Sequence, residues 1–64
     1  MRMREVIKRL EADGWYSVKA RGGHRQFKHP TKRGRVTVAG KPDADVKPKA
    51  LKTIWRQAQL PDES

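Results

Sequence analysis

The sequence predicts an α+β fold in which two helices pack on one face of a three-stranded antiparallel sheet, in the order helix, strand, strand, strand, helix. Two segments, one in each half of the chain, repeat apolar residues at helical spacing. Between them lie three short runs with residue types or alternation typical of strands, separated by glycines and prolines. The 64 residues allow one small domain. We expect it to fill residues 1–64, with a core over about 3–60 and a short acidic tail over 61–64.

The first helix is predicted over residues 3–12. Its apolar residues follow the i, i+3, i+4, i+7 rule and form one stripe: Met3, Val6, Ile7 and Leu10. Gly14 follows at the place where a helix commonly ends in a left-handed residue. The helix should therefore bury one face and stop before Gly14.

The first strand is predicted over "WYSVKAR", residues 15–21, because this run is rich in aromatic and β-branched residues. One parity holds Tyr16, Val18 and Ala20. The other parity holds Trp15, Ser17 and Lys19. The alternation alone leaves the burial of Trp15 open.

The second strand is predicted over residues 24–29, between a Gly-Gly turn and Pro30. Phe27 is its one large hydrophobe, so Phe27 should face the helices, with Arg25 and His29 on the same parity. The residues of the other parity should then face water: His24, Gln26 and Lys28.

The third strand is predicted over residues 35–39, after the polar turn "TKRG". The alternation predicts that Val36 and Val38 point inward and that Arg35 and Thr37 point outward. The second helical stripe consists of Leu51, Ile54, Trp55 and Ala58. Asp45 is expected to cap this helix, and Pro48 is tolerated in its first turn. Trp55 and Phe27 are therefore expected in the core rather than as exposed platforms for bases.

The chain is strongly basic, since 16 Lys and Arg against 7 Asp and Glu give a formal net charge of +9. This charge favours a polyanionic partner: nucleic acid first, an acidic protein second and a membrane last. The absence of cysteine excludes disulfides, thiolate chemistry and a cysteine zinc site. Charged residues near the N-terminus argue against a signal peptide, so we expect a cytoplasmic protein with no membrane partner.

The acidic residues are segregated from residues 14–42, which contain eight basic residues and no acidic one. Such a segment attracts a phosphate backbone through many counterion-releasing contacts. The two glycines of the turn would let a bulky backbone approach closely. The candidate RNA-binding residues are Lys19, Arg21, Gly22, Gly23, Arg25, Lys28, Lys32, Arg33 and Arg35.

His24 is the candidate catalytic residue. The surrounding cations disfavour its imidazolium form, so it is suited to accept a proton from a ribose 2′-hydroxyl. The same cations would stabilise charge on a pentacoordinate phosphate. Because the basic segment holds no carboxylate, a metal-ion nuclease is disfavoured, and we expect neither a metal nor a small-molecule cofactor.

Several alternatives stay open on pattern alone. His24 can simply contact nucleic acid, which would make the chain a non-catalytic RNA-binding module. His29, before Pro30, suits a turn-filling or phosphate-contacting role better than a catalytic one. A DNA-binding protein is disfavoured because neither helix carries the basic surface of a major-groove reader.

Four segments together resemble the HicA-type (YcfA-like) toxins of bacterial toxin–antitoxin pairs, over about residues 3–60. These segments are "LEADGW", "GGHRQFKHP", "RVTVAG" and "PKALKTIWRQAQL". The resemblance implies a fold like that of double-stranded-RNA-binding domains and the activity of a ribosome-independent mRNA interferase. It also implies an antitoxin of the HicB type that covers the histidine and the basic surface.

In that family the histidine of a Gly-x-His motif is catalytic, and the matching residue here is His24, preceded by Gly22 and Gly23. Family members usually carry Ser where this chain has Gly23, and often a second His where it has Arg25. They commonly show Ala-Gly-Leu where residues 58–60 read "AQL". The resemblance therefore implies the catalytic imidazole without the usual hydroxyl beside it.

Overall fold

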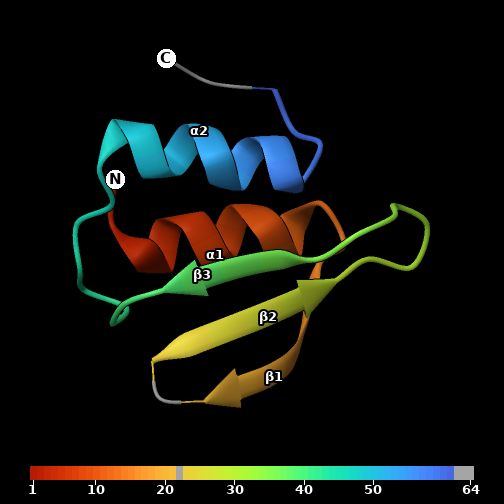
Figure 1. The fold of residues 1–64 in the computed structure, drawn as a ribbon, viewed down its shortest axis with the longest axis horizontal. Coiled ribbons are helices and arrows are strands. Elements are labelled where there is room, and N and C mark those ends of the chain that lie inside the picture. Colours follow the sequence, from red (N-terminus) through yellow and green to blue (C-terminus); the bar gives the residue numbers. More distant parts are fainter. Residues whose placement is uncertain (22, 62–64) are drawn as a thin grey trace.

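The computed structural model describes residues 1–21 and 23–61. Its elements follow the predicted order: α1 (Met3–Ala12), β1 (Tyr16–Arg21), β2 (His24–Lys28), β3 (Val36–Ala39) and α2 (Pro48–Gln57) (Figure 1). The strands form one antiparallel sheet in the order β1-β2-β3. The α+β fold class is confirmed, and each strand is one residue shorter than predicted. The predicted acidic tail falls mainly on residues 62–64, which lie outside the described residues.

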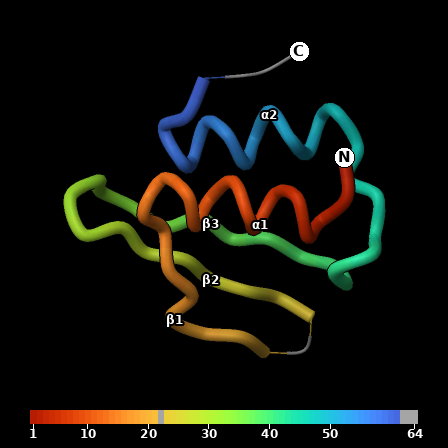
Figure 2. Tube along the Cα trace, turned by 180° about the vertical axis from the view of Figure 1, so that it is seen from behind, coloured from red at the N-terminus to blue at the C-terminus, as the bar shows by residue number. Residues whose placement is uncertain are grey.

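The two helices run side by side (Figures 1 and 2). Helix α1 lies along the sheet, and helix α2 lies past the edge of the sheet that β3 forms. The Arg9 guanidinium of α1 lies 4.5 Å from the centroid of the Trp55 ring of α2, a cation–π contact that joins the helices. The side-chain oxygen of Gln57 accepts the backbone N–H of Thr37 at 3.2 Å. This bond satisfies an outward N–H of β3, so α2 covers part of that sheet edge.

One core cluster joins both helices to one face of the sheet. Phe27, Val36 and Val38 are all at most 2% exposed, as their inward parity predicts. Trp55 is equally buried, so the prediction that Phe27 and Trp55 belong to the core is confirmed. Trp15, which the alternation left open, is 1% exposed. The cluster is completed by Met3, Val6, Leu10, Val46, Ile54 and Ala58.

A bulge in β1 changes the direction of its side chains. Ser17 pairs with Phe27, but the next pair along the strands is Lys19 with Gln26, so Val18 is an extra residue without a partner on β2. Paired residues of an antiparallel sheet point to the same face. Ser17 therefore shares the helix-covered face, whereas Lys19 lies on the open one.

The simple alternation predicted for Tyr16, Val18 and Ala20 is wrong for this reason. Tyr16 pairs with Lys28 and lies on the open face, while Ala20 pairs with Arg25 on the helix side. A single added residue moves all later side chains of the strand to the other face. Trp15 can thus be buried before the bulge while cations point to solvent after it.

The segment before α2 is held by the N-terminus of the chain rather than by a cap. The backbone N–H of Val46 donates to the carbonyl of Met1 at 2.7 Å, and the Asp45 carboxylate lies 3.3 Å from the N-terminal ammonium. The predicted cap at Asp45 is therefore wrong, because its side chain is engaged elsewhere. The N-cap residue is Lys47, without a side-chain cap, and Pro48 begins the helix as expected.

Gly14 ends the turn after α1 with φ of +106°, the left-handed region predicted there. A Cβ at this position would lie 2.8 Å from Nε2 of His29. Both the backbone conformation and the packing therefore require glycine. Gly34 shares the positive φ (+86°), but a Cβ there would meet no atom within 4 Å.

We predict that Gly14→Ala destabilises the fold more than Gly34→Ala does. The Gly34 variant measures the conformational cost alone, about 1 kcal/mol, whereas the Gly14 variant adds the displacement of His29. Urea unfolding followed by circular dichroism measures both. Equal losses in the two variants would contradict the packing role of Gly14.

Candidate nucleic-acid interface

The open face of the sheet is centred on β2. Strand alternation turns His24, Gln26 and Lys28 away from the buried Phe27, as predicted. His24 and Lys28 are exposed, and Gln26 is half-buried between its neighbours. The strand thus presents an imidazole, an amide and an ammonium in a row on the side opposite the helices.

Two cations from β1 lie beside this row because of the bulge. Arg21 pairs with His24, and Lys19 pairs with Gln26. Directly paired residues have Cβ atoms about 5 Å apart, within reach of one ligand. A shallow hollow on the open face is lined by these four residues: Lys19, Arg21, His24 and Gln26.

On the other side of β2, the open face continues onto β3. Ala39 pairs with His24, and Thr37 pairs with Gln26. Arg35, just before β3, donates from Nη1 to Oε1 of Gln26 at 3.3 Å. Small side chains therefore flank the histidine on this side, which keeps the imidazole accessible.

The His24 side chain makes no hydrogen bond or ion pair with any residue that the structure describes. Its side chain is exposed, and Arg21 is its partner across the strand pair. A polar ring that the fold does not engage is available to a ligand. The positive charge around it would bring an anionic ligand to this place.

The turn before His24 is held in place by its backbone. Gly23 has φ of +84°, and its carbonyl accepts the N–H of Gly40 at 3.0 Å. A Cβ at Gly23 would meet nothing within 4 Å, so the left-handed backbone rather than space favours glycine here. Gly22, the other candidate residue of the turn, lies outside the described residues.

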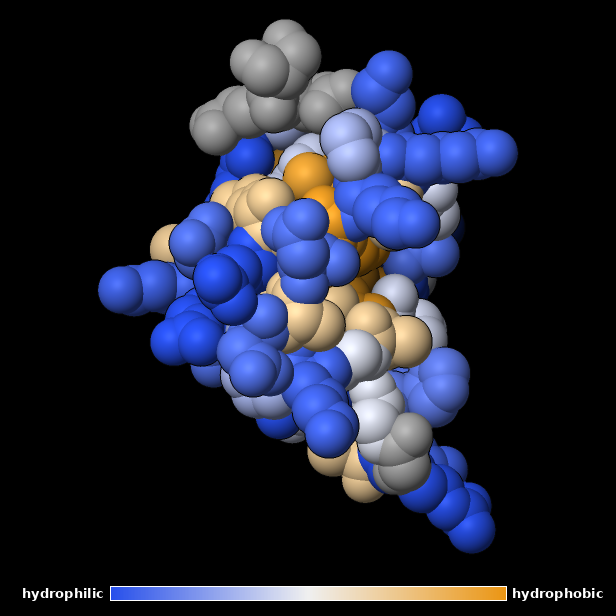
Figure 3. All heavy atoms as spheres, turned by 90° about the vertical axis from the view of Figure 1, so that its left-hand side faces the viewer, coloured by the Kyte–Doolittle hydropathy of each residue, from blue (hydrophilic) through white to orange (hydrophobic). Residues whose placement is uncertain are grey.

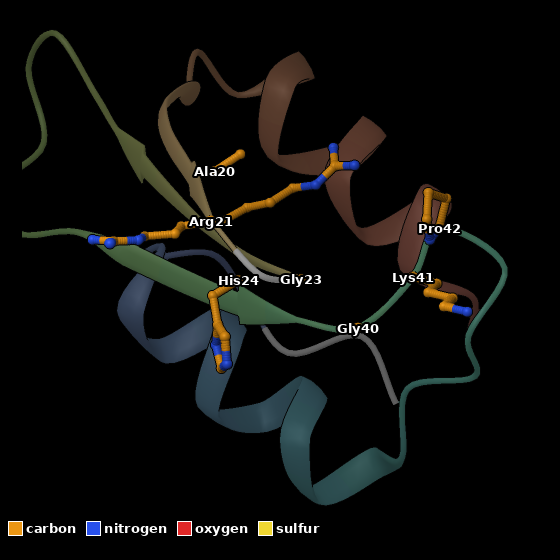
Figure 4. A pocket seen from close by; sticks show the side chains of 8 residues that line it. Ala20, Arg21, Gly23, His24, Gly40, Lys41 and Pro42 are labelled. Atoms are coloured by element: carbon orange, nitrogen blue, oxygen red, sulfur yellow. The ribbon is translucent and has the colours of Figure 1, made fainter.

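A second hollow surrounds this turn (Figure 4). Ala20 and His24 project in opposite directions, in agreement with their places on opposite faces. Across from them, Lys41 and Pro42 begin the segment that leads to α2. The cationic surface thus continues around the end of the sheet: the hollow is lined by Ala20, Arg21, Gly23, His24, Arg25, Gly40, Lys41 and Pro42.

Sequence-predicted cations do not all reach the open face. Arg25 is half-buried on the helix side, where it pairs with Val38. Arg33 is exposed in the loop before β3, and its carbonyl accepts Nε2 of Gln59 at 2.9 Å. The structure brings Lys19, Arg21, Lys28 and Arg35 to the open face. Arg25 lines only the second hollow, at the end of the sheet, and Lys32 and Arg33 lie elsewhere.

His29, unlike His24, is fully engaged in the fold. Its Nδ1 accepts the backbone N–H groups of Thr31 at 3.1 Å and Lys32 at 3.0 Å. The ring proton therefore lies on Nε2, which donates to the carbonyl of Asp13 at 2.6 Å. The side chain is only 9% exposed and stands edge-on to Trp15. These contacts give His29 the turn-filling role.

Lys32 belongs to the same cluster. Its ammonium lies 2.6 Å from the Asp13 carboxylate and donates to the carbonyls of Ala58 at 3.2 Å and Gln59 at 3.3 Å. Trp15 Nε1 also donates to the Asp13 carboxylate, at 3.2 Å. We call Asp13, Trp15, His29 and Lys32 the Asp13 cluster. It ties the ends of both helices to the sheet, so Lys32 has a structural task.

Figure 3 shows one side of the molecule, where mostly hydrophilic residues surround a narrow strip of strongly hydrophobic atoms and several paler hydrophobic patches. No helix within residues 1–21 and 23–61 is long and apolar enough to cross a membrane. Within the same residues, no group of three or more His, Asp and Glu side chains is placed to hold a metal ion.

Comparison with known families agrees with this architecture. The model of the family described as the HicA toxin of bacterial toxin–antitoxin systems matches residues 3–60 of the 64. The chain belongs to the HicA toxin family. A HicA toxin is one component of a toxin–antitoxin pair, so membership implies an antitoxin partner. A search of curated proteins finds no match.

In this HicA-family chain, two residues of the open face were not predicted from the sequence as part of the site: Tyr16 and Gln26. Tyr16 was missed because the bulge at Val18 is not visible in the alternation. Gln26 was expected to face water but not to lie in a hollow with His24. The sequence did hold one signal: Gln26 is two residues from His24 along the strand, so both side chains point to the same face.

We predict that the Asp13 cluster makes the stability of this HicA-family fold depend on acid. The hydrogen bond from Lys32 holds the pKa of the Asp13 carboxyl below its ordinary value of 3.8. A folded-state pKa below the unfolded one stabilises the fold above the unfolded pKa, and this contribution is lost as pH falls through the folded pKa. Asp13→Asn should therefore melt lower than wild type at neutral pH, and the difference should shrink below about pH 4.

Thermal melts of both proteins between neutral and acidic pH measure this difference. The matched control is Asp43→Asn, because the exposed Asp43 carboxylate makes no ion pair among the described residues. A difference for Asp13→Asn that stays constant across the whole range would refute the role of the ion pair.

Proposed function

We propose that this chain is an endoribonuclease that cleaves single-stranded mRNA on the open face of its sheet, with His24 as general acid/base. One observation carries the proposal. Of the two histidines, His29 is engaged in the Asp13 cluster, whereas His24 is exposed, without a partner among the described residues, and beside Arg21 and Lys19. An accessible imidazole among cations suits proton transfer next to a phosphate.

The reaction is transesterification at phosphorus. His24 takes the proton of the ribose 2′-hydroxyl, and the 2′-oxygen forms a bond to the adjacent phosphorus. The bond from phosphorus to the 5′-oxygen of the next nucleotide breaks, and the proton held by His24 passes to that oxygen through a water molecule. The products are a 2′,3′-cyclic phosphate and a free 5′-hydroxyl, and the imidazole is regenerated.

The cations of the open face stabilise the charge that develops on the phosphate. Arg21 pairs with His24 and Lys19 pairs with Gln26, so we assign Arg21 a bidentate contact with the phosphate that reacts and Lys19 a second contact beside it. Lys28 is four residues along β2, about 13 Å away, so it binds a neighbouring phosphate instead. Arg25 is half-buried on the other face, so we assign the contact at the reacting phosphate to Arg21 rather than to Arg25.

This chemistry restricts the substrate to RNA, because DNA lacks the attacking hydroxyl. It also needs no metal ion, since the nucleophile belongs to the substrate and the charge is neutralised by side chains. We therefore propose a metal-independent reaction without a small-molecule cofactor. An mRNA substrate places the site of action in the cytoplasm.

The antitoxin partner, in this proposal, is of the HicB type and binds over the open face. The chain carries a formal net charge of +9, and the open face is lined by Lys19, Arg21 and Lys28. A partner surface rich in carboxylates would complement this charge and cover His24. Inhibition would then follow from direct exclusion of RNA.

A defined mRNA incubated in EDTA with wild type, His24→Ala and His24→Gln tests the proposal. We predict cleavage by wild type, with cyclic phosphate ends, and at least a hundredfold slower cleavage by both variants, since general acid–base catalysis contributes about that much or more. His24→Gln is the matched variant, because its amide keeps size and polarity but cannot transfer the proton. Circular dichroism confirms that all three are folded.

Two results would overturn the proposal. Fragments with 5′-phosphate ends, or cleavage that requires Mg²⁺, would exclude the 2′-hydroxyl mechanism. If wild type binds RNA and leaves it intact, the chain is a non-catalytic RNA-binding module, with an affinity that falls steeply with salt.

A further inference from the structure

Tyr16 is an exposed aromatic residue on the same face as His24. The chain contains two Trp, one Phe and one Tyr, all within the described residues. Trp15, Trp55 and Phe27 are at most 2% exposed, whereas Tyr16 is 49% exposed. The fold thus buries three aromatic rings and leaves one on the surface that faces the candidate substrate.

The bulge determines where this ring lies. Tyr16 pairs with Lys28, and Lys28 shares the face of Gln26 and His24 because they alternate along β2. Without the extra residue at Val18, Tyr16 would share the face of Ala20 toward the helices. The Tyr16 hydroxyl has no hydrogen bond among the described residues, so the fold does not use its polar end.

An exposed ring beside a lysine has the chemistry of a nucleobase platform. The flat faces of aromatic side chains stack on unpaired bases, while neighbouring ammonium groups bind the phosphates. Lys28 is the direct neighbour of Tyr16 across the strand pair, and His24 lies about 13 Å further along the same strand. A single strand of RNA that follows β2 would therefore bring a base to Tyr16 when its reacting phosphate is at His24.

We propose that Tyr16 stacks on an unpaired base a few nucleotides from the phosphate that is cleaved. This inference rests on the proposed function and specifies its substrate class. A base in a duplex is already covered on both sides by its neighbours, so only single-stranded RNA offers a free base to Tyr16. Tyr16 is thus a determinant of selectivity for single strands, separate from the chemistry at His24.

The test uses the His24→Ala background, in which RNA stays intact. Single-stranded RNAs with 2-aminopurine at successive positions are titrated with protein carrying Tyr16, Tyr16→Phe, Tyr16→Leu or Tyr16→Ala. Fluorescence reports stacking at each position, and the same titrations give the dissociation constants. Duplex RNA of the same sequence is the comparison, and unfolding midpoints verify that each variant is folded.

We expect quenching at one or two adjacent positions with Tyr16 and Tyr16→Phe. Tyr16→Leu and Tyr16→Ala should lose that quenching and bind single strands on the order of tenfold more weakly. The leucine variant is the matched control, because it keeps a large apolar side chain without the ring. Binding to duplex RNA should not change in any variant.

Equal affinity and equal quenching in all four proteins would overturn the inference. So would a loss in Tyr16→Phe as large as in Tyr16→Ala, because the hydroxyl rather than the ring would then be responsible. These readings are separate from the cleavage assay. Cleavage by wild type with no effect at Tyr16 rejects only the stacking, and stacking without cleavage rejects only the catalytic proposal.

Discussion

Val18 adds one residue to β1 relative to β2, and the composition of the open face depends on this bulge. Strict alternation would place Trp15, Lys19 and Arg21 on the same face, so that either the tryptophan would be exposed or the cations would point at the helices. The bulge resolves this conflict. Trp15 enters the core, while Lys19 and Arg21 lie beside His24. The bulge that lets Trp15 enter the core of this small domain therefore also creates the positive surface beside His24.

The two histidines differ in whether the fold engages their side chains. His29 is held by hydrogen bonds at both ring nitrogens and packs edge-on to Trp15. The Asp13 cluster around it ties α1, α2 and the sheet together at one end of the molecule. His24, five residues earlier on the opposite face, makes no such contacts among the described residues. The polar contacts thus fix one end of the molecule, while the imidazole of His24 stays exposed at the other.

Much of the fold was predictable because it follows from hydrophobic periodicity. The stripes of the helices and the alternation around Phe27, Val36 and Val38 gave the element order and the open face. The actual contact of Asp45 was not predictable, because the N-terminus that binds its carboxylate is distant in sequence, and the cap expected there does not form. The positions of the Tyr16 and Lys32 side chains could not be predicted either. A bulge and an ion pair between residues 19 positions apart leave no periodic signal.

We propose that RNA binds to the open face of the sheet and not to the helices. The most direct measurement is methyl NMR of the His24→Ala protein titrated with single-stranded RNA. Thr37 and Ala39 carry methyl groups on β3 beside Gln26 and His24, and the half-buried Ile7 and the exposed Ala12 provide methyl groups on α1. We predict large shift changes for Thr37 and Ala39 and small ones for Ile7 and Ala12. Changes confined to Ile7 and Ala12 would contradict the proposal, because they would place the RNA on the helical side.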